Sequence, residues 1–253
     1  SSIGYLKEKG VLENSGYERF TARLKADYQA TDWLHLLANA SYVHADRESN
    51  PNLSNTNSNA SNLGYFTQYI SPIYPIYVRT IDANGNPVIA TDRFGHPQYD
   101  FGVPATNFQG LNGRPFSQTG NPLGSNRYNK VNDILDQLQG QLNFDITFTP
   151  WLKFNSTNSI TLILSRFSHY ENPFIGNAAA TNGSIDKYTD VSYRWNYVQT
   201  LNAHKVFGLH DVQLMVGHEW YKMNKNFLEA LARGGFSPAI QEINAFADRY
   251  NSY

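Results

Sequence analysis

The residue types that most often carry catalysis occur in this sequence, but they are not grouped in a catalytic pattern. The seven histidines are spread along the chain, and none has a metal-binding spacing such as His-Glu-x-x-His. His218 and Glu219 are adjacent, so on a strand their side chains point to opposite faces. The nucleophile motif Gly-x-Ser-x-Gly and a phosphate-binding glycine loop are both absent from the sequence. We therefore expect no enzymatic activity, no metal and no cofactor.

A better candidate for function is a group of aromatic residues in a polar, asparagine-rich stretch. The group consists of Tyr65, Phe66, Tyr69, Tyr74 and Tyr77. Aromatic faces stack on sugar rings or peptide side chains, and asparagine amides add specific hydrogen bonds. The alternative interpretation, which we favour for each ring, is that these aromatics pack the loop onto itself or onto a partner that covers it.

The elements that position these residues are long strands with one apolar and one polar face. Apolar and polar side chains alternate along them, and this alternation is typical of a half-buried β-strand. Most of the strands run about 12 residues or more, whereas strands of globular proteins average about 5–6. Gly140 interrupts one apolar row and is expected to mark a bulge. The seven expected strands are Ser2–Glu8, Glu18–Gln29, Leu34–Asp46, Asp133–Phe148, Leu152–Phe167, Asp190–Ala203 and Asp211–Met223.

The connections between these strands are alternately short and long. The short ones are Ala30–Trp33, Thr149–Trp151 and Lys205–His210. The long ones are Arg47–Asn132 and Ser168–Thr189, and the tail after Asn224 is expected to begin a third long loop. Tight turns on one side and elaborate loops on the other are typical of a barrel in a bacterial outer membrane.

Two local structures are expected outside the long strands. Ile76–Ile81 and Pro87–Thr91 flank Asn84-Gly85, which is a strong hairpin signal. Asp82, Asn84 and Asn86 faintly resemble a calcium loop, but the Asn-Gly turn alone explains them. Near the end of the chain, Ser237-Pro238 predicts a short helix over Ala239–Ala247, with a serine cap and proline in the first turn.

Composition narrows the class of protein further. The net charge of −1 argues against a nucleic-acid partner, and no apolar run approaches the length of a transmembrane helix. The absence of cysteine excludes disulfides and cysteine-based zinc sites.

A soluble β-sandwich shows the same alternation as a membrane barrel. Aromatic residues near the strand ends favour the barrel, because they fit two girdles at the membrane interfaces. The expected girdle residues are Tyr28, Trp33, Tyr42, Phe148, Trp151, Trp220 and Tyr221.

Several segments resemble the barrel of SusC/RagA-type TonB-dependent transporters of Bacteroidetes. The clearest is the strand Gly16–Tyr28 followed by Thr31-Asp32-Trp33-Leu34. Further similar segments are Asn121-Pro122-Leu123, Leu138–Thr147 with Pro150-Trp151-Leu152-Lys153-Phe154, and Phe207-Gly208-Leu209-His210-Asp211 with Gly217-His218-Glu219-Trp220. Each segment is a strand-and-turn signature of moderate specificity, and together they span nearly the whole chain.

The resemblance implies an antiparallel transmembrane β-barrel of about 22 strands with a plugged lumen and long extracellular loops, in the outer membrane. It also implies import of oligosaccharides or peptides, a SusD-like surface lipoprotein as partner, and energy from the TonB complex. The family's plug domain and TonB box have no counterpart in these residues. We therefore interpret residues 1–253 as part of one barrel domain, with about seven strands and the long loop 47–132. A siderophore-type TonB-dependent receptor and a soluble β-sandwich that binds glycans remain the alternatives.

Overall fold

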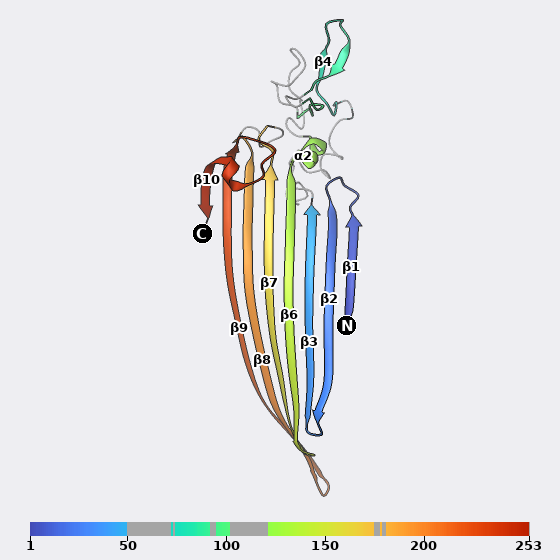
Figure 1. The fold of residues 1–253 in the computed structure, drawn as a ribbon, viewed down its shortest axis with the longest axis vertical. Helices are drawn as coiled ribbons and strands as arrows, with labels where there is room; N and C mark the ends of the chain where they lie inside the picture. The colour runs from blue at the N-terminus through green and yellow to red at the C-terminus, as the bar shows by residue number, and fades with distance from the viewer. Residues whose placement is uncertain are drawn as a thin grey trace.

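The main feature of the computed structural model is one long, curved antiparallel sheet (Figure 1). The structure describes residues 1–49, 72, 74–91, 95–101, 121–174, 178 and 181–252. The order of the strands in the sheet follows the chain, so each strand pairs with its sequence neighbours. This confirms the all-β class, and the long antiparallel strands are those of a barrel segment. The strands are β1 (Ser2–Lys9), β2 (Gly16–Thr31), β3 (Leu34–Ser49), β6 (Lys130–Thr149), β7 (Leu152–Glu171), β8 (Ser184–Phe207), β9 (His210–Gly235) and β10 (Phe246–Ser252).

Each of the seven strands expected from alternation is present, but the last part of the chain differs from the expectation. The tail after Asn224 is not a loop, because β9 continues to Gly235. There it pairs with β10, an eighth strand of the sheet that alternation did not reveal. Beyond Asn224 the sequence no longer alternates strictly, because Phe227 and Leu228 place apolar side chains on both faces.

The two ends of the sheet carry different connections, as expected. At one end, which we call the turn end, two-residue turns join the strands: Asp32-Trp33, Pro150-Trp151 and Gly208-Leu209. Gly208 has φ 60°, a left-handed conformation that suits glycine. The longer connections lie at the opposite end, the loop end, which is at the top of Figure 1.

The bulge expected at Gly140 is not formed. Gly140 pairs with Ala40 on β3 and with Ile160 on β7 without any shift of register. A Cβ at this position would lie 3.4 Å from Ile160 Cγ2, so the glycine makes room for a neighbouring side chain instead of bending the strand. The register shifts occur beside the turns, at Gln29/Thr31 and Thr147/Thr149.

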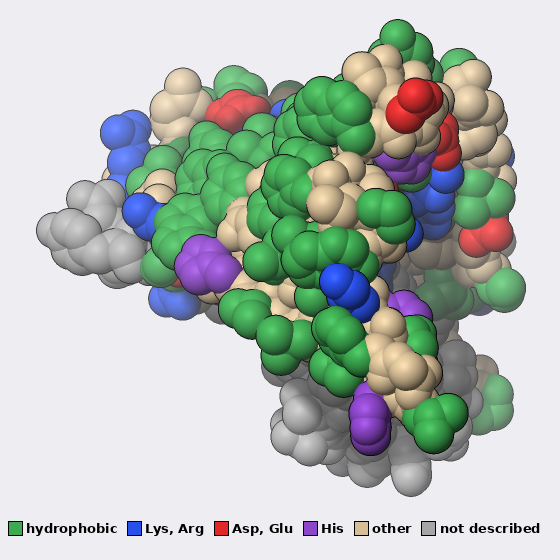
Figure 2. Space-filling model, turned by 90° about the horizontal axis from the view of Figure 1, so that it is seen from below, with side chains coloured by type: hydrophobic (Ala, Val, Ile, Leu, Met, Phe, Trp, Pro, Cys, Tyr) green, Lys and Arg blue, Asp and Glu red, His purple; other side chains and the backbone are tan. Residues whose placement is uncertain are grey.

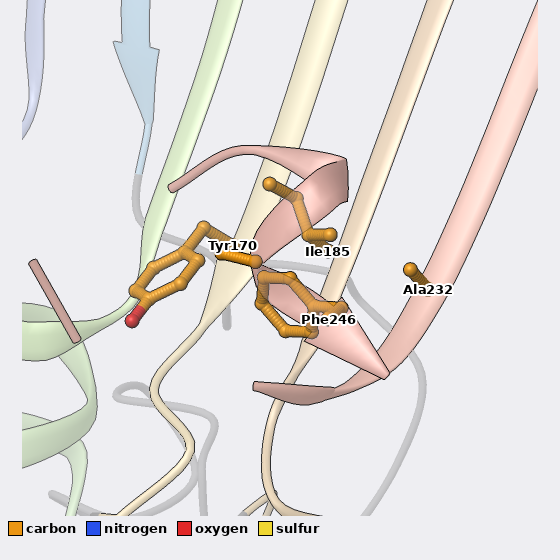
Figure 3. Packing of buried hydrophobic residues seen from close by; sticks show 5 residues of the cluster. Tyr170, Ile185, Ala232 and Phe246 are labelled. Atoms are coloured by element: carbon orange, nitrogen blue, oxygen red, sulfur yellow. The ribbon is translucent and has the colours of Figure 1, made fainter. Parts of the chain in front are cut away.

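The helix expected over 239–247 is also wrong. The chain forms only a 3₁₀ turn, η3 (Ile243–Ala245), and then enters β10. The Ser237 hydroxyl does accept a hydrogen bond from the backbone N–H of Ala239, at 3.3 Å. Phe246 is 2 % exposed because it packs against Tyr170 and Ile185 of the sheet (Figure 3). This packing outweighs the local helix signal.

The Asn-Gly hairpin in the long loop is confirmed. β4 (Arg79–Ile81) and β5 (Pro87–Ile89) pair as a separate two-stranded sheet. Asp82 Oδ1 accepts hydrogen bonds from the backbone N–H groups of Asn84 and Asn86, at 2.9 and 2.8 Å. These bonds lower the pKa of Asp82, with the Asn86 backbone as the largest cause. One oxygen of the carboxylate is thus used to close the turn.

A short helix, α2 (Pro122–Tyr128), was not predicted and organises the loop end. Asn121 caps it by accepting a hydrogen bond from the Gly124 N–H at 3.1 Å. The same side chain donates to the backbone carbonyls of Ile76 and Asp100, at 2.8 and 3.1 Å. Proline in the first turn fits this start, because the missing N–H is not needed there.

Candidate functional site

The register gathers the apolar rows of six strands onto a single face of the sheet, which we call the apolar face. Leu24, Ala40, Gly140, Ile160 and Trp195 lie in one row across β2, β3, β6, β7 and β8. No second sheet covers this face among the described residues. Figure 2 looks at the turn end and shows hydrophobic side chains gathered on the surface.

The central part of the apolar face carries no charge on β2, β3, β6, β7 and β8, whereas on β9 the uncharged part ends at Lys222, which lies beside Trp195 on the same face. We call this uncharged part the band; it comprises the outward-pointing residues of 20–28 on β2, 34–42 on β3, 138–148 on β6, 152–164 on β7, 191–203 on β8 and 212–220 on β9. None of these described residues is Asp, Glu, Lys or Arg. On β6 the band covers about 11 residues, the length of strand that crosses a hydrocarbon layer.

At the loop end the band stops at a hydrogen-bonded polar cluster. Asp136 Oδ1 accepts a hydrogen bond from the Tyr42 hydroxyl and lies 2.7 Å from His44 Nδ1. Arg166 donates to the other carboxylate oxygen at 2.7 Å. These residues come from β3, β6 and β7, and Asp136 and His44 lie in the same row as Phe20 and Leu164. The cluster therefore marks the border between an apolar and a polar surface on β3 and β6.

At the turn end the border is a lysine held among aromatic rings. Lys205 Nζ lies 5.5 Å from the ring centre of Trp151 and 5.2 Å from that of Phe207. A long side chain that lies along rings while its ammonium reaches outward is typical of a membrane interface.

Most of the expected girdle residues lie on the surface. Tyr28, Trp33, Phe148, Trp151, Trp220 and Tyr221 are all exposed. Trp220 stacks on Tyr197 at 5.2 Å within the apolar face. Tyr221, however, pairs with Asn196 and points to the opposite, polar face. Adjacent residues of a strand cannot face the same way, so Trp220 and Tyr221 cannot both belong to one girdle, and Trp220 lies in the row of Leu142 near the middle of the band.

An aromatic row on β8 was not among the expected girdle residues. Tyr193, Trp195 and Tyr197 all point outward on the apolar face, and Tyr193 stacks on Trp195 at 5.9 Å. Their period-two spacing is visible in the sequence. Their place on the apolar face follows only from the register, which sets Tyr193 beside Leu162 and Asn224 near the loop end and Tyr197 beside Asn158 and Trp220 in the middle of the band.

Only two of the five loop aromatics are among the residues that the structure describes. Tyr65, Phe66 and Tyr69 lie outside the described residues, whereas Tyr74 and Tyr77 are half-buried.

Tyr77 packs within its own loop. Its ring lies 4.8 Å from that of Tyr99, whose other neighbour, Tyr128, is edge-on at 5.8 Å. Burial, followed by a hydrogen bond with Tyr77, raises the pKa of Tyr99 to about 12. The structure thus gives Tyr77 a packing partner in the loop.

The polar face carries a hydrogen-bond network near the turn end. His35 on β3 bridges two carboxylates, with Nε2 2.6 Å from Asp27 and Nδ1 3.1 Å from Asp145. Asn155 donates to Asp145 at 2.7 Å, and Asn202 donates to Asn155 at 2.9 Å. The network crosses five strands, so this wall presents amides, carboxylates and an imidazole to whatever the polar face encloses.

Across the described parts of the chain, no group of three or more His, Asp or Glu side chains is arranged to hold a metal ion. The helices in those parts are all too short or too polar to cross a membrane.

The comparisons with known proteins rest on structure. No family model matches the sequence, and no curated protein matches it. Three solved chains are similar to almost the whole of this one. They come from the RagAB peptide importer in its "closed-closed" state (TM-score 0.67, 17 % identity), the RagAB peptide transporter (0.66, 17 %) and the importer in its "open-open" state (0.65, 16 %). Each comparison covers 99 % of this chain but 26 % of the solved chain, so this chain spans about a quarter of their length. At this identity the likeness establishes the fold: the long antiparallel sheet has the arrangement of a segment of those importer chains.

Proposed function

We propose that residues 1–253 form part of one β-barrel domain of an outer-membrane, TonB-dependent importer of nutrients, either oligosaccharides or peptides. The observation that carries this proposal is the band: an uncharged, uncovered apolar surface of membrane-spanning width, bordered by polar groups at both ends. In water such a surface would be costly, because burial of apolar area is the main favourable term in folding. In hydrocarbon it is the surface that a barrel needs.

The apolar face beyond the band supports the same assignment. Ile185 and Ala232 lie on this face at the loop end, past the polar border, and both are 0 % exposed because protein covers them. Within the band, Leu214 and Val216 are 63 % and 61 % exposed. At the loop end protein thus covers Ile185 and Ala232, whereas Leu214 and Val216 inside the band are left for lipid.

Import is supported by the polar face and by the solved chains of similar fold. A closed barrel with this curvature would turn the network around His35 and Asp145 toward its lumen. The similar chains belong to a peptide importer, which favours nutrient uptake.

We propose a SusD-like surface lipoprotein and the TonB complex as partners, with TonB acting through other parts of the protein. The loop aromatics are proposed to contact the substrate or the lipoprotein.

The alternatives receive less support. A siderophore-type receptor would use the same barrel and differs in its cargo. A soluble β-sandwich needs a second sheet over the apolar face, and the described residues contain none. The similar solved chains are transporters, which gives no reason to propose an enzyme.

The membrane assignment can be tested by labelling adjacent residues. Leu36→Cys places a thiol in the band and Leu37→Cys places one on the polar face. A lipid-soluble maleimide should label the first in outer-membrane vesicles and leave the second unlabelled. Equal labelling of both positions would contradict the assignment.

Import itself can be tested with cells that lack the gene. Uptake of labelled oligopeptides and oligosaccharides should fall, and the gene should restore it. Unchanged uptake of both cargo classes, with loss of ferric-siderophore uptake instead, would favour the receptor alternative.

A further inference from the structure

The middle of the polar face carries positive but no negative side chains. We call this part the cationic belt; it comprises the residues that point to the polar face among 21–25 on β2, 39–43 on β3, 137–141 on β6, 159–163 on β7, 192–196 on β8 and 221–225 on β9. None of these described residues is Asp or Glu. The belt contains four cations: Arg23, Lys25, Arg194 and Lys225. The whole chain has a net charge of −1, so the belt does not simply reflect the composition.

Three of these cations have no counter-charge on the sheet. Lys225 Nζ lies 2.7 Å from a carboxylate oxygen of Asp190, so this pair is neutral. Arg23, Lys25 and Arg194 form no ion pair with any residue that the structure describes, and all three residues are exposed. Charged groups without a partner on the wall of a binding cavity are available to an anionic ligand.

The carboxylates in the two adjoining rows do not supply this counter-charge. Asp190 pairs with Lys225, and Asp27 lies 2.6 Å from His35 Nε2. The third carboxylate, Glu219, lies on β9, two rows from the nearest free cation. The negative charge that meets the three cations therefore comes from outside the described residues.

Amides and hydroxyls fill the belt between the cations. Arg23 and Arg194 lie in one row, with Ser41, Gln139 and Thr161 between them. At about 4.8 Å per strand, the two arginines are roughly 19 Å apart along the sheet. The belt thus offers positive charge at both flanks and hydrogen-bonding groups in the middle.

We propose that the cationic belt selects acidic oligopeptides, by binding the carboxylates of Asp or Glu side chains at alternate positions of an extended cargo. The inference rests on the proposed function, in which the polar face lines the lumen of an importer. Alternate side chains of an extended peptide lie on one side, about 7 Å apart, and Arg23 and Lys25 have the same spacing on β2. Guanidinium groups bind carboxylates through two parallel hydrogen bonds, and the amides of the belt can pair with a peptide backbone. A neutral cargo would leave the three cations unpaired, so the pattern favours an acidic one.

Uptake by the native protein tests the selection without any substitution. Cells that lack the gene receive it in full length, and uptake is measured for three labelled peptides of equal length, in which Ser alternates with Glu, Gln or Lys. The Glu peptide should reach half-maximal uptake at about a tenfold lower concentration than the Gln peptide. Added salt should narrow the difference, because it screens the charges.

The outcomes separate this inference from the proposed function. Equal gene-dependent uptake of the three peptides would overturn the inference and leave peptide import standing. Uptake of an oligouronate in place of the peptides would also overturn it, because the carboxylates would then belong to a sugar, although import itself would stand. If the gene changes the uptake of no peptide and no oligosaccharide, the proposed function fails together with the inference.

Reversal of the charge on β2 gives an effect that lost stability cannot mimic. Arg23→Glu combined with Lys25→Glu should make the Lys peptide the preferred cargo, because substitutions on the lumen face of a barrel change its selectivity. Lys153→Glu is the control, since Lys153 is also an exposed cation on the polar face but lies at the turn end, outside the belt. The control should keep the preference for the Glu peptide. The same preference in the double variant would show that the belt does not select the cargo.

Arg194→Gln tests the opposite flank of the belt with a milder change. The concentration for half-maximal uptake should rise about tenfold for the Glu peptide and stay the same for the Gln peptide. The amount of folded protein in the outer membrane is measured for every variant, and Arg194→Gln decides if the double variant does not fold. Equal losses for the two peptides would show that this cation serves the structure of the barrel and not the cargo.

Discussion

Phe246 meets Tyr170 edge-on, with the two ring centroids 6.3 Å apart, where the end of the chain folds over the loop end of the sheet. Ile185, Ala232 and Ala245 complete this small core, and all five residues are at most 2 % exposed (Figure 3). The Tyr170 hydroxyl also donates to the Pro238 carbonyl, at 3.4 Å. The same sheet face is therefore covered by protein here and uncovered farther along the strands.

Phe246→Ala should loosen this end of the sheet. Removing a buried phenylalanine typically costs about 3–5 kcal/mol, through lost burial and the cavity left behind. We expect faster amide exchange around Tyr170 and Ile185 and earlier proteolysis of the segment 236–246. Phe148→Ala is the control, because Phe148 is 58 % exposed at the turn end and its loss should leave exchange at the loop end unchanged. Equal protection in the two variants would mean that the small core does not hold the segment in place.

A charge placed in the band should block folding into the membrane. Leu142 is near the middle of the band on β6, and an arginine facing the bilayer midplane costs about 2–4 kcal/mol. Leu142→Arg should therefore lower the folded, heat-modifiable fraction in outer membranes. Gln141→Arg adds the same charge one residue away on the polar face and should fold nearly as well as the native protein. Similar yields for both variants would contradict the assignment of lipid and lumen faces.

The sequence reveals the strands far better than it reveals their interactions. Alternation marks each long strand because one face is apolar and the other polar, and the tight turns follow from the residues between them. The alternation is lost after Asn224, so the sequence does not predict the end of β9 or its pairing with β10. The bridge from His35 to Asp145 depends on pairing across 110 residues of sequence separation, and no local pattern contains that register. Likewise, the local sequence that predicts a helix over 239–247 contains no information on the packing of Phe246 against Tyr170 and Ile185.

The Asp82 turn should depend on pH only under strongly acid conditions. Hydrogen bonds from the backbone of Asn86 and Asn84 hold the pKa of Asp82 below its usual value. A carboxylate with a lowered pKa stabilises the folded form above its usual pKa, and this stabilisation is lost as the pH falls through the lowered pKa. Amide exchange at Asn84 and Asn86 should thus stay slow near neutrality and rise only in acid. Asp82→Ala should show fast exchange at every pH; protection as strong as in the native protein would show that the carboxylate does not hold the turn.

The raised pKa of Tyr99 predicts that the loop loses stability as the pH rises, the opposite of the acid dependence expected at Asp82. Its pKa is raised to about 12 by burial and by the hydrogen bond with Tyr77. Because the folded loop holds the neutral phenol, its stability is complete below the usual tyrosine pKa of about 10 and is lost as the pH rises toward 12. Proteolysis of the loop should accelerate across that interval. Tyr99→Phe cannot ionise, so its cleavage should rise less over the same interval. Identical profiles would show that Tyr99 does not control the loop.

Removing the Asp145 carboxylate from the polar-face network should lower the free energy of unfolding. Asp145 joins His35 to Asn155, so Asp145→Leu leaves an imidazole nitrogen and an amide without their partners. A buried polar group that loses its partner costs about 1–3 kcal/mol, and here the cost is toward the lower end because the side chain of Asp145 is 44 % exposed. Thr147→Leu, on the same strand and face, is the control and should stay within about 0.5 kcal/mol of the native protein. The midpoint of urea unfolding in detergent micelles measures both. Equal midpoints would mean that the five-strand network adds nothing to the wall, whereas a lower midpoint for Asp145→Leu alone would identify this carboxylate as the group that ties β3 to β7 across β6.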